Sequence, residues 1–503
     1  MFKISQSLIN RGASIRSVSI RAAVVNTAED HLRPWQDIPG PLSLPIIGQI
    51  LHFLPGGWLY KRTVELQELL YKNYGPIVRI DGSFGLDPII FIYDPEAAIN
   101  LFRKEDQDLM PHRPGFDSIA YYREKVYNQN KDDPIGLIID NGERWKKMRF
   151  SINQVMLKTK MIKLYGNTME EVAVDMIDRI RSIRNEDNTL KNNIFTELNL
   201  WALESVGVVA LGGRLNCFDP NLPDDSPAKK LIKTIHDVLA VSEKLDFQPS
   251  LWKYFSTSTY KKGMKLYEEH MKLNEYFVDK ASDELKSTGE KDYKDKSVLE
   301  KVLDIDRKIA LATAHDMLFA GVDTAGSTVL ALLYLLATNE EKQEKLREEV
   351  LSKREKRPYI RACIKESLRL YPIIGGNFRR TTKEHEILGY RIPKDINIVV
   401  GNQHLCRMDE QFPRANEFIP ERWIVDKSDP LHYGQAHPFS YTPFGFGLRG
   451  CVGRRIAELE LETFVTKIME NFKLEWSGPP PKRIRSSSLF YFTGPFNFII
   501  KDL

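Results

Sequence analysis

Cysteine is scarce in this sequence of 503 residues, which contains four: Cys217, Cys363, Cys406 and Cys451. So few cysteines exclude a disulfide-rich scaffold, and the lack of paired CxxC spacing argues against a structural zinc site. Long apolar runs are missing too, since the longest, Val329–Ala337, is far shorter than the roughly 18 residues that cross a bilayer. The hydrophobic fraction of 42% and the charged fraction of 28% are ordinary for a globular protein, which excludes disordered, collagenous and coiled-coil classes.

An excess of charge is also lacking, because the formal net charge is +4. Residues 1–28 contain four basic residues and no acid, and with these set aside the 72 Lys and Arg residues fall to the number of Asp and Glu residues, 68. A neutral body argues against nucleic acid as a partner, because such proteins need a basic face. The basic, serine-rich head is typical of a mitochondrial transit peptide, which we place at 1–33, and a disordered basic tail is the alternative.

Hydrophobic periodicity predicts a mainly α-helical fold with small β-sheets. Helices are expected at 60–74, 141–156, 160–183, 193–211, 226–243, 258–286, 306–337, 339–352, 359–370 and 451–470. Strands are expected at 77–80, 89–93, 377–381, 385–388 and 396–400, the first two as a hairpin. The lysine-rich stretch 286–301 is expected to be a solvated loop. No linker divides the chain, so residues 34–503 are predicted to form one large domain.

The densest local signal is the glycine-rich segment Phe444–Gly453, which contains Cys451. Its glycines allow backbone conformations that side chains would block, and a helix is expected to begin at Cys451. The N-terminus of such a helix stabilises a thiolate, which is the form of cysteine that binds metal. A single cysteine is otherwise a small buried apolar residue, and we interpret the other three in that way.

These ten residues together resemble the haem-binding loop of the cytochromes P450. The resemblance implies that Cys451 is the axial thiolate of a haem b, that Phe444 packs near its sulfur, and that Arg449 binds a haem propionate. A thiolate ligand donates electron density to iron and favours cleavage of the O–O bond. The resemblance covers nearly the whole chain after residue 34, and it implies the fold of that family.

The long helix expected at 306–337 contains residues that weaken a helix or need polar partners. Gly321 costs about 1 kcal/mol relative to alanine, and Thr324 can bond back to a carbonyl one turn earlier and distort the helix. A polar helix face is the ordinary explanation for Asp323 and Thr324. Beside the cysteine loop, however, the segment resembles the oxygen-activation motif of the same family. That resemblance implies that Gly321 admits oxygen, and that Asp323 and Thr324 deliver protons to it.

Other cationic and acidic residues match further family positions. Trp145 and Arg149 resemble the helix that binds a haem propionate, and Arg379 resembles a second propionate contact; a surface cation is the alternative for each. Glu366 and Arg369 lie three residues apart on one predicted helix. By resemblance they form a structural triad with Arg422, which is followed by Trp423 where the family segment often has Phe.

The basic residues Arg361, Lys365, Arg454 and Arg455 resemble those of mitochondrial-type members of the family, insect members in particular. The resemblance implies that they bind an acidic [2Fe–2S] ferredoxin, and it agrees with the predicted transit peptide. We therefore expect a mitochondrial location on the matrix side of the inner membrane. Peripheral membrane contact is expected at Trp252, Tyr254 and Phe255, for which core packing is the alternative.

The function implied is that of a haem-thiolate monooxygenase, which inserts one atom of O2 into an apolar small molecule. Electrons would come from NADPH through ferredoxin reductase and ferredoxin. A haem-binding gas sensor or carrier without turnover is the alternative. Candidate pocket residues are Tyr121, Phe319, Ile373 and Phe490, and both steroid or ecdysteroid-like compounds and xenobiotics are open as substrates.

Overall fold

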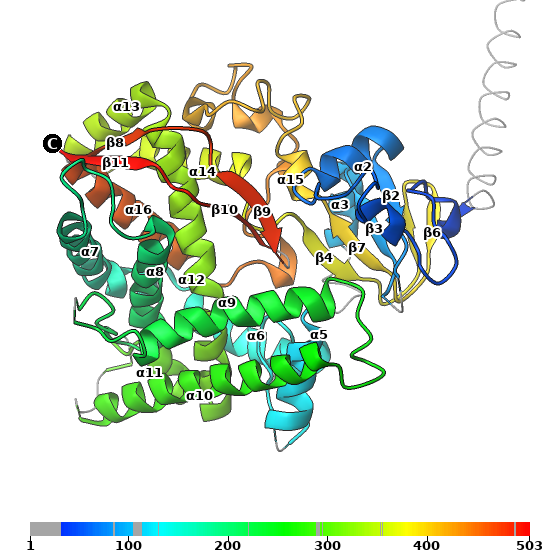
Figure 1. Cartoon of the computed structure of the whole chain (residues 1–503), viewed down its shortest axis with the longest axis horizontal. Helices are drawn as coiled ribbons and strands as arrows, with labels where there is room; N and C mark the ends of the chain where they lie inside the picture. The colour runs from blue at the N-terminus through cyan, green and yellow to red at the C-terminus, as the bar shows by residue number, and fades with distance from the viewer. Residues whose placement is uncertain are drawn as a thin grey trace, which may run out of the picture.

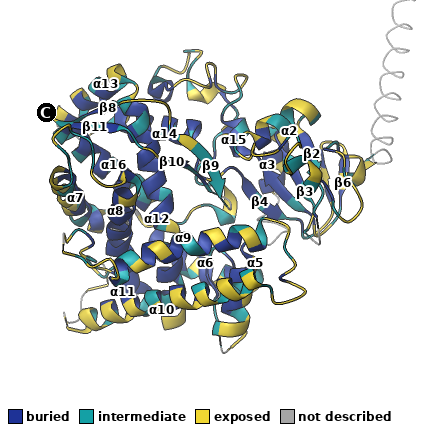
Figure 2. Ribbon diagram, in the orientation of Figure 1, coloured by how far each residue is buried: buried dark blue, intermediate teal, exposed yellow. Residues whose placement is uncertain are grey.

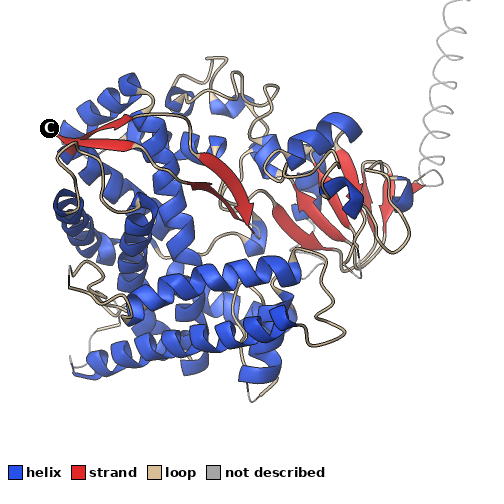
Figure 3. Ribbon diagram, viewed as in Figure 1, coloured by secondary structure: helices blue, strands red, loops and turns tan. Residues whose placement is uncertain are grey.

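Helices make up most of the molecule, and most of the strands gather at one end of it (Figure 3). The computed structural model describes residues 32–503 except 84–85, 104–112, 129, 220, 288–291, 294, 353, 355 and 487–488. The predicted transit peptide at 1–33 lies almost wholly outside the described residues. The rest confirms the predicted class, a mainly helical single domain with small sheets.

The expected helices lie close to their predicted positions, and further helical segments at 95–103, 117–127, 298–303 and 402–405 were not predicted. They are α2 (Leu66–Tyr74), α3 (Pro95–Arg103), α5 (Asp117–Tyr121), the π-helical turn η3 (Tyr122–Tyr127), α6 (Gly142–Met156), α7 (Thr159–Ser182), α8 (Ile194–Ala210), α9 (Pro227–Asp246), α10 (Ser258–Ser287), α11 (Val298–Leu303), α12 (Arg307–Ala337), α13 (Glu340–Leu351), α14 (Pro358–Leu370), α15 (Asn402–Leu405) and α16 (Arg454–Asn471). The helix expected at 60–74 is shorter than predicted and begins at Leu66. Lys61 has a left-handed φ of 58°, which interrupts helical geometry. The expected solvated loop at 286–301 is too long as well, because Ser297 caps α11 there.

The strands form four small sheets. They are β1 (Arg33–Pro34), β2 (Ile77–Ile80), β3 (Ile89–Ile92), β4 (Asn377–Arg380), β5 (His385–Ile387), β6 (Tyr390–Ile392), β7 (Asn397–Val400), β8 (Phe472–Trp476), β9 (Lys482–Ser486), β10 (Leu489–Thr493) and β11 (Phe498–Asp502). The largest sheet has the order β2-β3-β7-β4, with β2 and β3 forming the expected antiparallel hairpin and β3 parallel to β7. Figure 1 shows this sheet with α2 and α3 at one end, beside the helical body.

Helix α12 runs through the middle of the helical body (Figure 1). Asp306 caps its start by accepting hydrogen bonds from Lys308 N at 2.7 Å and Ile309 N at 3.0 Å. The helix is buried on most sides, as the dark blue in Figure 2 shows, because α8, α10, α14 and α16 all pack on it. By length and composition α12 could cross a membrane, but 78% of its most apolar window is buried inside the protein, as in a core helix.

Candidate active site

Cys451 lies in a tight loop that leads into α16. Gly445 and Gly447 have φ values of 73° and 70°, which side chains disfavour, and the loop closes as Cys451 N donates to Phe444 O at 2.8 Å. The helix begins at Arg454 and not at Cys451, because Val452 and Gly453 form a turn first. The dipole of α16 therefore starts three residues later than expected, but the Gly453 N–H still bonds the Cys451 sulfur.

The electrostatic setting of Cys451 differs from that of the other cysteines. Protein atoms packed around the sulfur raise the pKa of the thiol by desolvation even though the side chain stays accessible, while the Gly453 N–H and the charges of Arg149 and Arg454 act in the opposite direction. Its side chain is exposed, whereas those of the other three cysteines are buried. Burial also raises the pKa of Cys217, Cys363 and Cys406, and Cys406 donates to Ser440 O at 3.2 Å. The structure therefore agrees with their interpretation as buried small residues.

Arginines lie both within the cysteine loop and on the segments packed against it. Arg149 on α6 donates to Gly450 O at 2.8 Å, and its buried Nε has no hydrogen-bond partner among the described residues. Arg449 donates to Leu137 O at 3.1 Å and to Asp140 O at 2.7 Å. Its guanidinium lies 3.8 Å from the centre of the Trp145 ring. Because the Trp145 indole N–H is used by Leu137 O at 3.1 Å, this side chain supports Arg449 rather than reaching outward itself.

Positive charge is concentrated around the cysteine loop. Arg379 on β4 donates to Phe446 O at 3.0 Å. Burial, followed by the charges of Arg113 and Arg379, lowers the pKa of Arg449 to about 8. The nearby carboxylate of Asp140 is already paired with Arg144 at 2.8 Å. A ligand with carboxylate groups would reduce the repulsion among these guanidinium groups, so the residues fit the two propionates of a haem whose iron would be held by Cys451.

Arg113 is a member of this cluster that sequence reasoning missed. Burial and the charge of Arg379 lower the pKa of its guanidinium, and the charge of Cys451 acts in the opposite direction. It lies in the loop before α5, far along the chain from the other arginines. A single cation in a proline-containing loop gives no signal in the sequence, and only the tertiary structure places it beside the cysteine.

The predicted oxygen-activation residues lie on two faces of α12. Thr324 Oγ1 donates to Ala320 O at 2.7 Å, one turn earlier, as expected. Residues Arg307–Ala337 nevertheless form one continuous α-helix, so this hydrogen bond does not interrupt the helix. Asp323 is buried and faces α8 and α9, where its Oδ1 lies 2.8 Å from His236 Nε2 and 3.2 Å from Asn199 Nδ2.

Gly321 has a packing role in the structure. A Cβ at this position would lie 2.7 Å from Val206 Cγ2, and one at Gly326 would lie 2.3 Å from Asn199 Oδ1. The two glycines therefore let α8 approach α12 closely, which brings Asn199 within hydrogen-bond distance of Asp323. Admission of oxygen by Gly321 stays a prediction.

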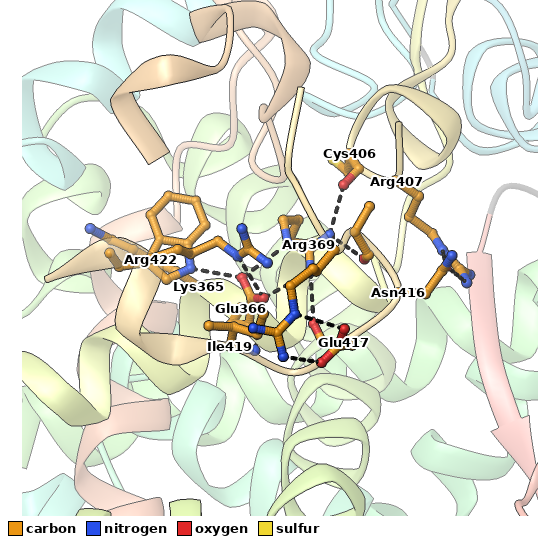
Figure 4. A network of polar contacts seen from close by, with 12 residues as sticks. Lys365, Glu366, Arg369, Cys406, Arg407, Asn416, Glu417, Ile419 and Arg422 are labelled. Atoms are coloured by element: carbon orange, nitrogen blue, oxygen red, sulfur yellow. Dashed lines mark hydrogen bonds and ion pairs between the residues drawn. The ribbon is translucent and has the colours of Figure 1, made fainter. Parts of the chain in front are cut away.

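The three residues of the predicted triad come together in the core (Figure 4). Arg369 donates to both carboxylate oxygens of Glu366, at 2.8 and 2.9 Å, and Arg422 Nε donates to Glu366 Oε1 at 2.9 Å. All three side chains are fully buried. Trp423 joins them, because its indole N–H donates to Glu366 Oε2 at 2.9 Å. The tryptophan that differs from the family pattern thus makes a hydrogen bond that phenylalanine cannot make.

Three of the four predicted ferredoxin-binding residues lie near one another. Arg361 pairs with Glu462 at 2.8 Å, and Arg454 pairs with Glu458 at 2.9 Å. Lys365 lies 5.5 Å from the centre of the Trp423 ring; burial lowers the pKa of its ammonium, as do the charges of Arg454 and Arg361. Arg455 instead points to the junction of α6 and α7, where it donates to Leu157 O at 2.7 Å. Adjacent residues on a helix diverge by about 100°, which separates it from Arg454.

The four predicted pocket residues lie in different surroundings. Phe319 lines a cavity of about 10 Å³ with residues of η3 and α10, including His270. Ile373 and Phe490 are buried together, with Phe490 N donating to Ile373 O at 2.8 Å. Tyr121 is 42% exposed and packs its ring against Trp252 at 5.9 Å.

The chain is similar to known proteins over most of its length. The family model described as Cytochrome P450 matches residues 38–498. Similar curated proteins include "Cytochrome P450 CYP12A2" of Musca domestica, 37% identical over 93% of this chain and 92% of the relative, and "Probable cytochrome P450 12b2, mitochondrial" of Drosophila melanogaster, 33% identical over 99% and 96%. The solved structure "Retinoic acid bound cyanobacterial CYP120A1" is similar in fold, with a TM-score of 0.71 at 20% identity, covering 94% of this chain and 100% of that one. The chain therefore belongs to the cytochrome P450 family.

Proposed function

We propose that this cytochrome P450 monooxygenase holds a haem b through Cys451 and inserts one atom of O2 into an apolar small molecule. When bound, the haem supplies the iron at which oxygen is activated, and a thiolate ligand favours cleavage of the O–O bond. The observation that carries the proposal is the exposed Cys451 in its glycine-rich loop, surrounded by Arg113, Arg149, Arg379 and Arg449. The arginines would bind the propionates and so orient the haem.

The chain's own residues would then control protons and water. Thr324 keeps its hydroxyl fixed by donating to Ala320 O, which leaves the oxygen lone pairs as acceptors toward the exposed side of Ala320. Asp323 directly precedes Thr324 in the chain, and its carboxylate is held by Asn199 and His236. Asp323 is buried, and so are the residues that flank the pair formed by Asp323 and Thr324, so protons would reach this part of α12 through polar side chains.

The binding of haem is tested by the carbon monoxide spectrum of the reduced protein. Wild-type protein reconstituted with haem should show the red-shifted Soret band of a thiolate ligand, and Cys451→Ala should lose it. A Cys406→Ala variant is the matched control, because that cysteine is buried against Ser440. A thiolate spectrum that persists without Cys451 would contradict the ligand assignment.

We also propose that electrons come from NADPH through ferredoxin reductase and an acidic [2Fe–2S] ferredoxin. The support is the group formed by Arg361, Lys365 and Arg454, and the curated relatives whose names include the word mitochondrial. Turnover is tested with this electron chain and a panel of ecdysteroid precursors and xenobiotics such as 7-ethoxycoumarin, first screened by spectral shift. A protein that binds carbon monoxide through a thiolate but oxidises no panel compound would instead fit a gas sensor or carrier.

Peripheral attachment to the matrix side of the inner membrane is a further part of the proposal. Tyr254 and Phe255, in the loop between α9 and α10, expose 70% and 58% of their surface. Trp252 is buried and donates to Leu245 O at 3.0 Å, so it belongs to the core. Exposed apolar side chains of this size fit contact with a lipid surface. Flotation of the protein with cardiolipin-containing vesicles, compared with a Tyr254→Ser, Phe255→Ser variant, tests this contact.

A further inference from the structure

The closest partner of Asp323 is a histidine that reaches the surface. Asp323 Oδ1 lies 2.8 Å from His236 Nε2, and the side chain of Asp323 is 8% exposed while that of His236 is 42% exposed. Asn199 Nδ2 donates to the same carboxylate oxygen at 3.2 Å. Among the described residues, no hydrogen bond is formed at His236 Nδ1, and the partly exposed side chain lets solvent reach the imidazole. The pair thus connects the surface of the molecule to the interior face of α12.

We propose that His236 is the entry point through which protons pass from solvent to Asp323 and then to Thr324. The inference rests on the proposed function, because oxygenation consumes protons. Each turnover takes up two protons and two electrons, places one oxygen atom in the product and releases the other as water. A residue that relays those protons must be able to gain and lose one near neutral pH, and histidine is the side chain that does so.

The relay step balances within the chain. Protonated His236 gives its Nε2 proton to the Asp323 carboxylate, so that an N–H bond breaks and an O–H bond forms. The neutral imidazole that remains keeps its proton on Nδ1. When the ring turns over, the bare nitrogen faces solvent and takes a proton there, which restores the protonated form. The carboxylic acid of Asp323 passes its proton to a water held at Thr324 and returns to the carboxylate. The Thr324 oxygen can accept a hydrogen bond from that water because its own proton is donated to Ala320 O.

The groups around His236 favour its charged form. Burial alone would lower the pKa of the imidazole, but the hydrogen bond and charge of Asp323, with the charge of Asp237 on the same helix, raise it. From α8 the ring meets neutral Phe195 and Asn199, and behind Phe195 lies the ring of Tyr491 on β10. Farther along α9, Glu243 faces Arg485 of β9. Asp323 is therefore the nearest charge from another element.

If His236 only stabilised the fold through its ion pair with Asp323, any cation at this position would serve, because an ion pair needs charge but no exchange of protons. His236→Arg would keep a cation beside Asp323 but could not release a proton near neutral pH. His236→Gln would keep a donor without charge. Lys230→Gln is the control, since this exposed residue on the same helix lies away from Asp323.

The first experiment measures pairing without turnover. Thermal unfolding of haem-loaded wild type and His236→Gln is followed from about pH 6 to about pH 8.5. Because the folded-state pKa of His236 is raised, its stabilising contribution is present below the unfolded value and is lost as the pH rises through the folded value. Wild type should therefore exceed the variant in melting temperature at the acidic end and lose that advantage at the basic end. A difference that does not change with pH would overturn the pairing.

The second experiment measures the relay, with whichever panel compound the wild type oxidises. Both His236→Arg and His236→Gln should lower product formation about tenfold or more and increase the solvent deuterium isotope effect, while Lys230→Gln should match wild type. His236→Ala should recover part of the rate when free imidazole is added. If His236→Arg shows the same rate and isotope effect as wild type, the relay is overturned. If the arginine variant does not fold, His236→Lys replaces it in this comparison. Wild type that oxidises no panel compound contradicts the proposed function instead.

Discussion

At the scale of single residues, the buried carboxylate of Glu366 shows how many donors one charge needs. It accepts hydrogen bonds from Arg369, Arg422, Trp423 and the Ile419 N–H, all within 3.1 Å. Two arginines face one glutamate, and the second positive charge is offset by backbone carbonyls, such as Ala415 O at 2.7 Å from Arg369. A buried ion group of this kind is stable because nearly all of its hydrogen-bonding groups are satisfied.

Trp423→Phe tests the contribution of the indole N–H in that cluster. The ring is kept but the hydrogen bond to Glu366 Oε2 is lost, so the free energy of unfolding should fall by about 1.5–3 kcal/mol. Trp476→Phe is the control, because that indole donates to the exposed carbonyls of Gly478 and Pro479. Chemical denaturation of the two variants measures the difference. Equal losses would show that the bond to Glu366 has no special weight.

At the scale of elements, the contact of α8 with α12 depends on glycine. Gly321→Ala should lower the free energy of unfolding by about 1–3 kcal/mol, because the new Cβ would meet Val206 Cγ2 at 2.7 Å. Adding Val206→Ala should restore most of that loss by removing the clash. Gly166→Ala on α7 is the control, since a Cβ there meets nothing within 4 Å, and it should be neutral or stabilising. Denaturation of the single and double variants measures the coupling, and additive losses would rule out a direct clash.

The elements α5, α9 and α10 are joined by a cluster around Asp246. Its Oδ1 accepts from Ser118 N at 3.0 Å and its Oδ2 from Ser118 Oγ at 2.6 Å, and Ser118 Oγ also contacts Tyr267 OH at 2.7 Å. Burial raises the pKa of Asp246 to about 7. These contacts tie the short helix α5 to the two long helices that lie across α12.

Asp246→Asn should therefore change how stability depends on pH. A carboxyl whose folded-state pKa is raised contributes stability at low pH, and that contribution is lost as the pH rises from the unfolded value near 4 to about 7. Wild type should lose melting temperature across this interval, and the variant should lose less. Melting curves at several pH values check this, with Asp224→Asn, on an exposed side chain, as the control. Parallel curves for wild type and Asp246→Asn would contradict the raised pKa.

At the scale of the whole molecule, the small net charge conceals a local group of basic residues at the proposed ferredoxin-binding surface. Arg361 and Arg454 are partly neutralised by Glu462 and Glu458, whereas Lys365 lies over the rings of Trp423 and Tyr433. Lys365→Gln should raise the KM for an acidic ferredoxin several-fold with little change in kcat. It should also weaken the dependence of binding on salt, because steering by charge is screened. Lys230→Gln on α9 is the control, and titration of ferredoxin at two ionic strengths is the measurement.

The sequence by itself determined the helical class, most helix positions, the cysteine loop and the residues of the buried ion triad, because these depend on local periodicity and on motifs of short spacing. It misplaced the start of α16, since three loop residues after the glycines can continue as a turn or as a helix with similar local preference. It also missed Arg113, which has no local signal.

Only the tertiary structure decided which side chains meet. It brought Arg113, Arg149 and Arg379 to the cysteine loop, placed the Trp423 indole N–H against Glu366, and placed Asp323 beside His236. These pairings join residues tens to hundreds of positions apart, and such contacts arise from the packing of helices across the core. Hydrogen bonds and charges act over a few ångströms in space, so their partners are fixed by the fold and not by the order of residues along the chain.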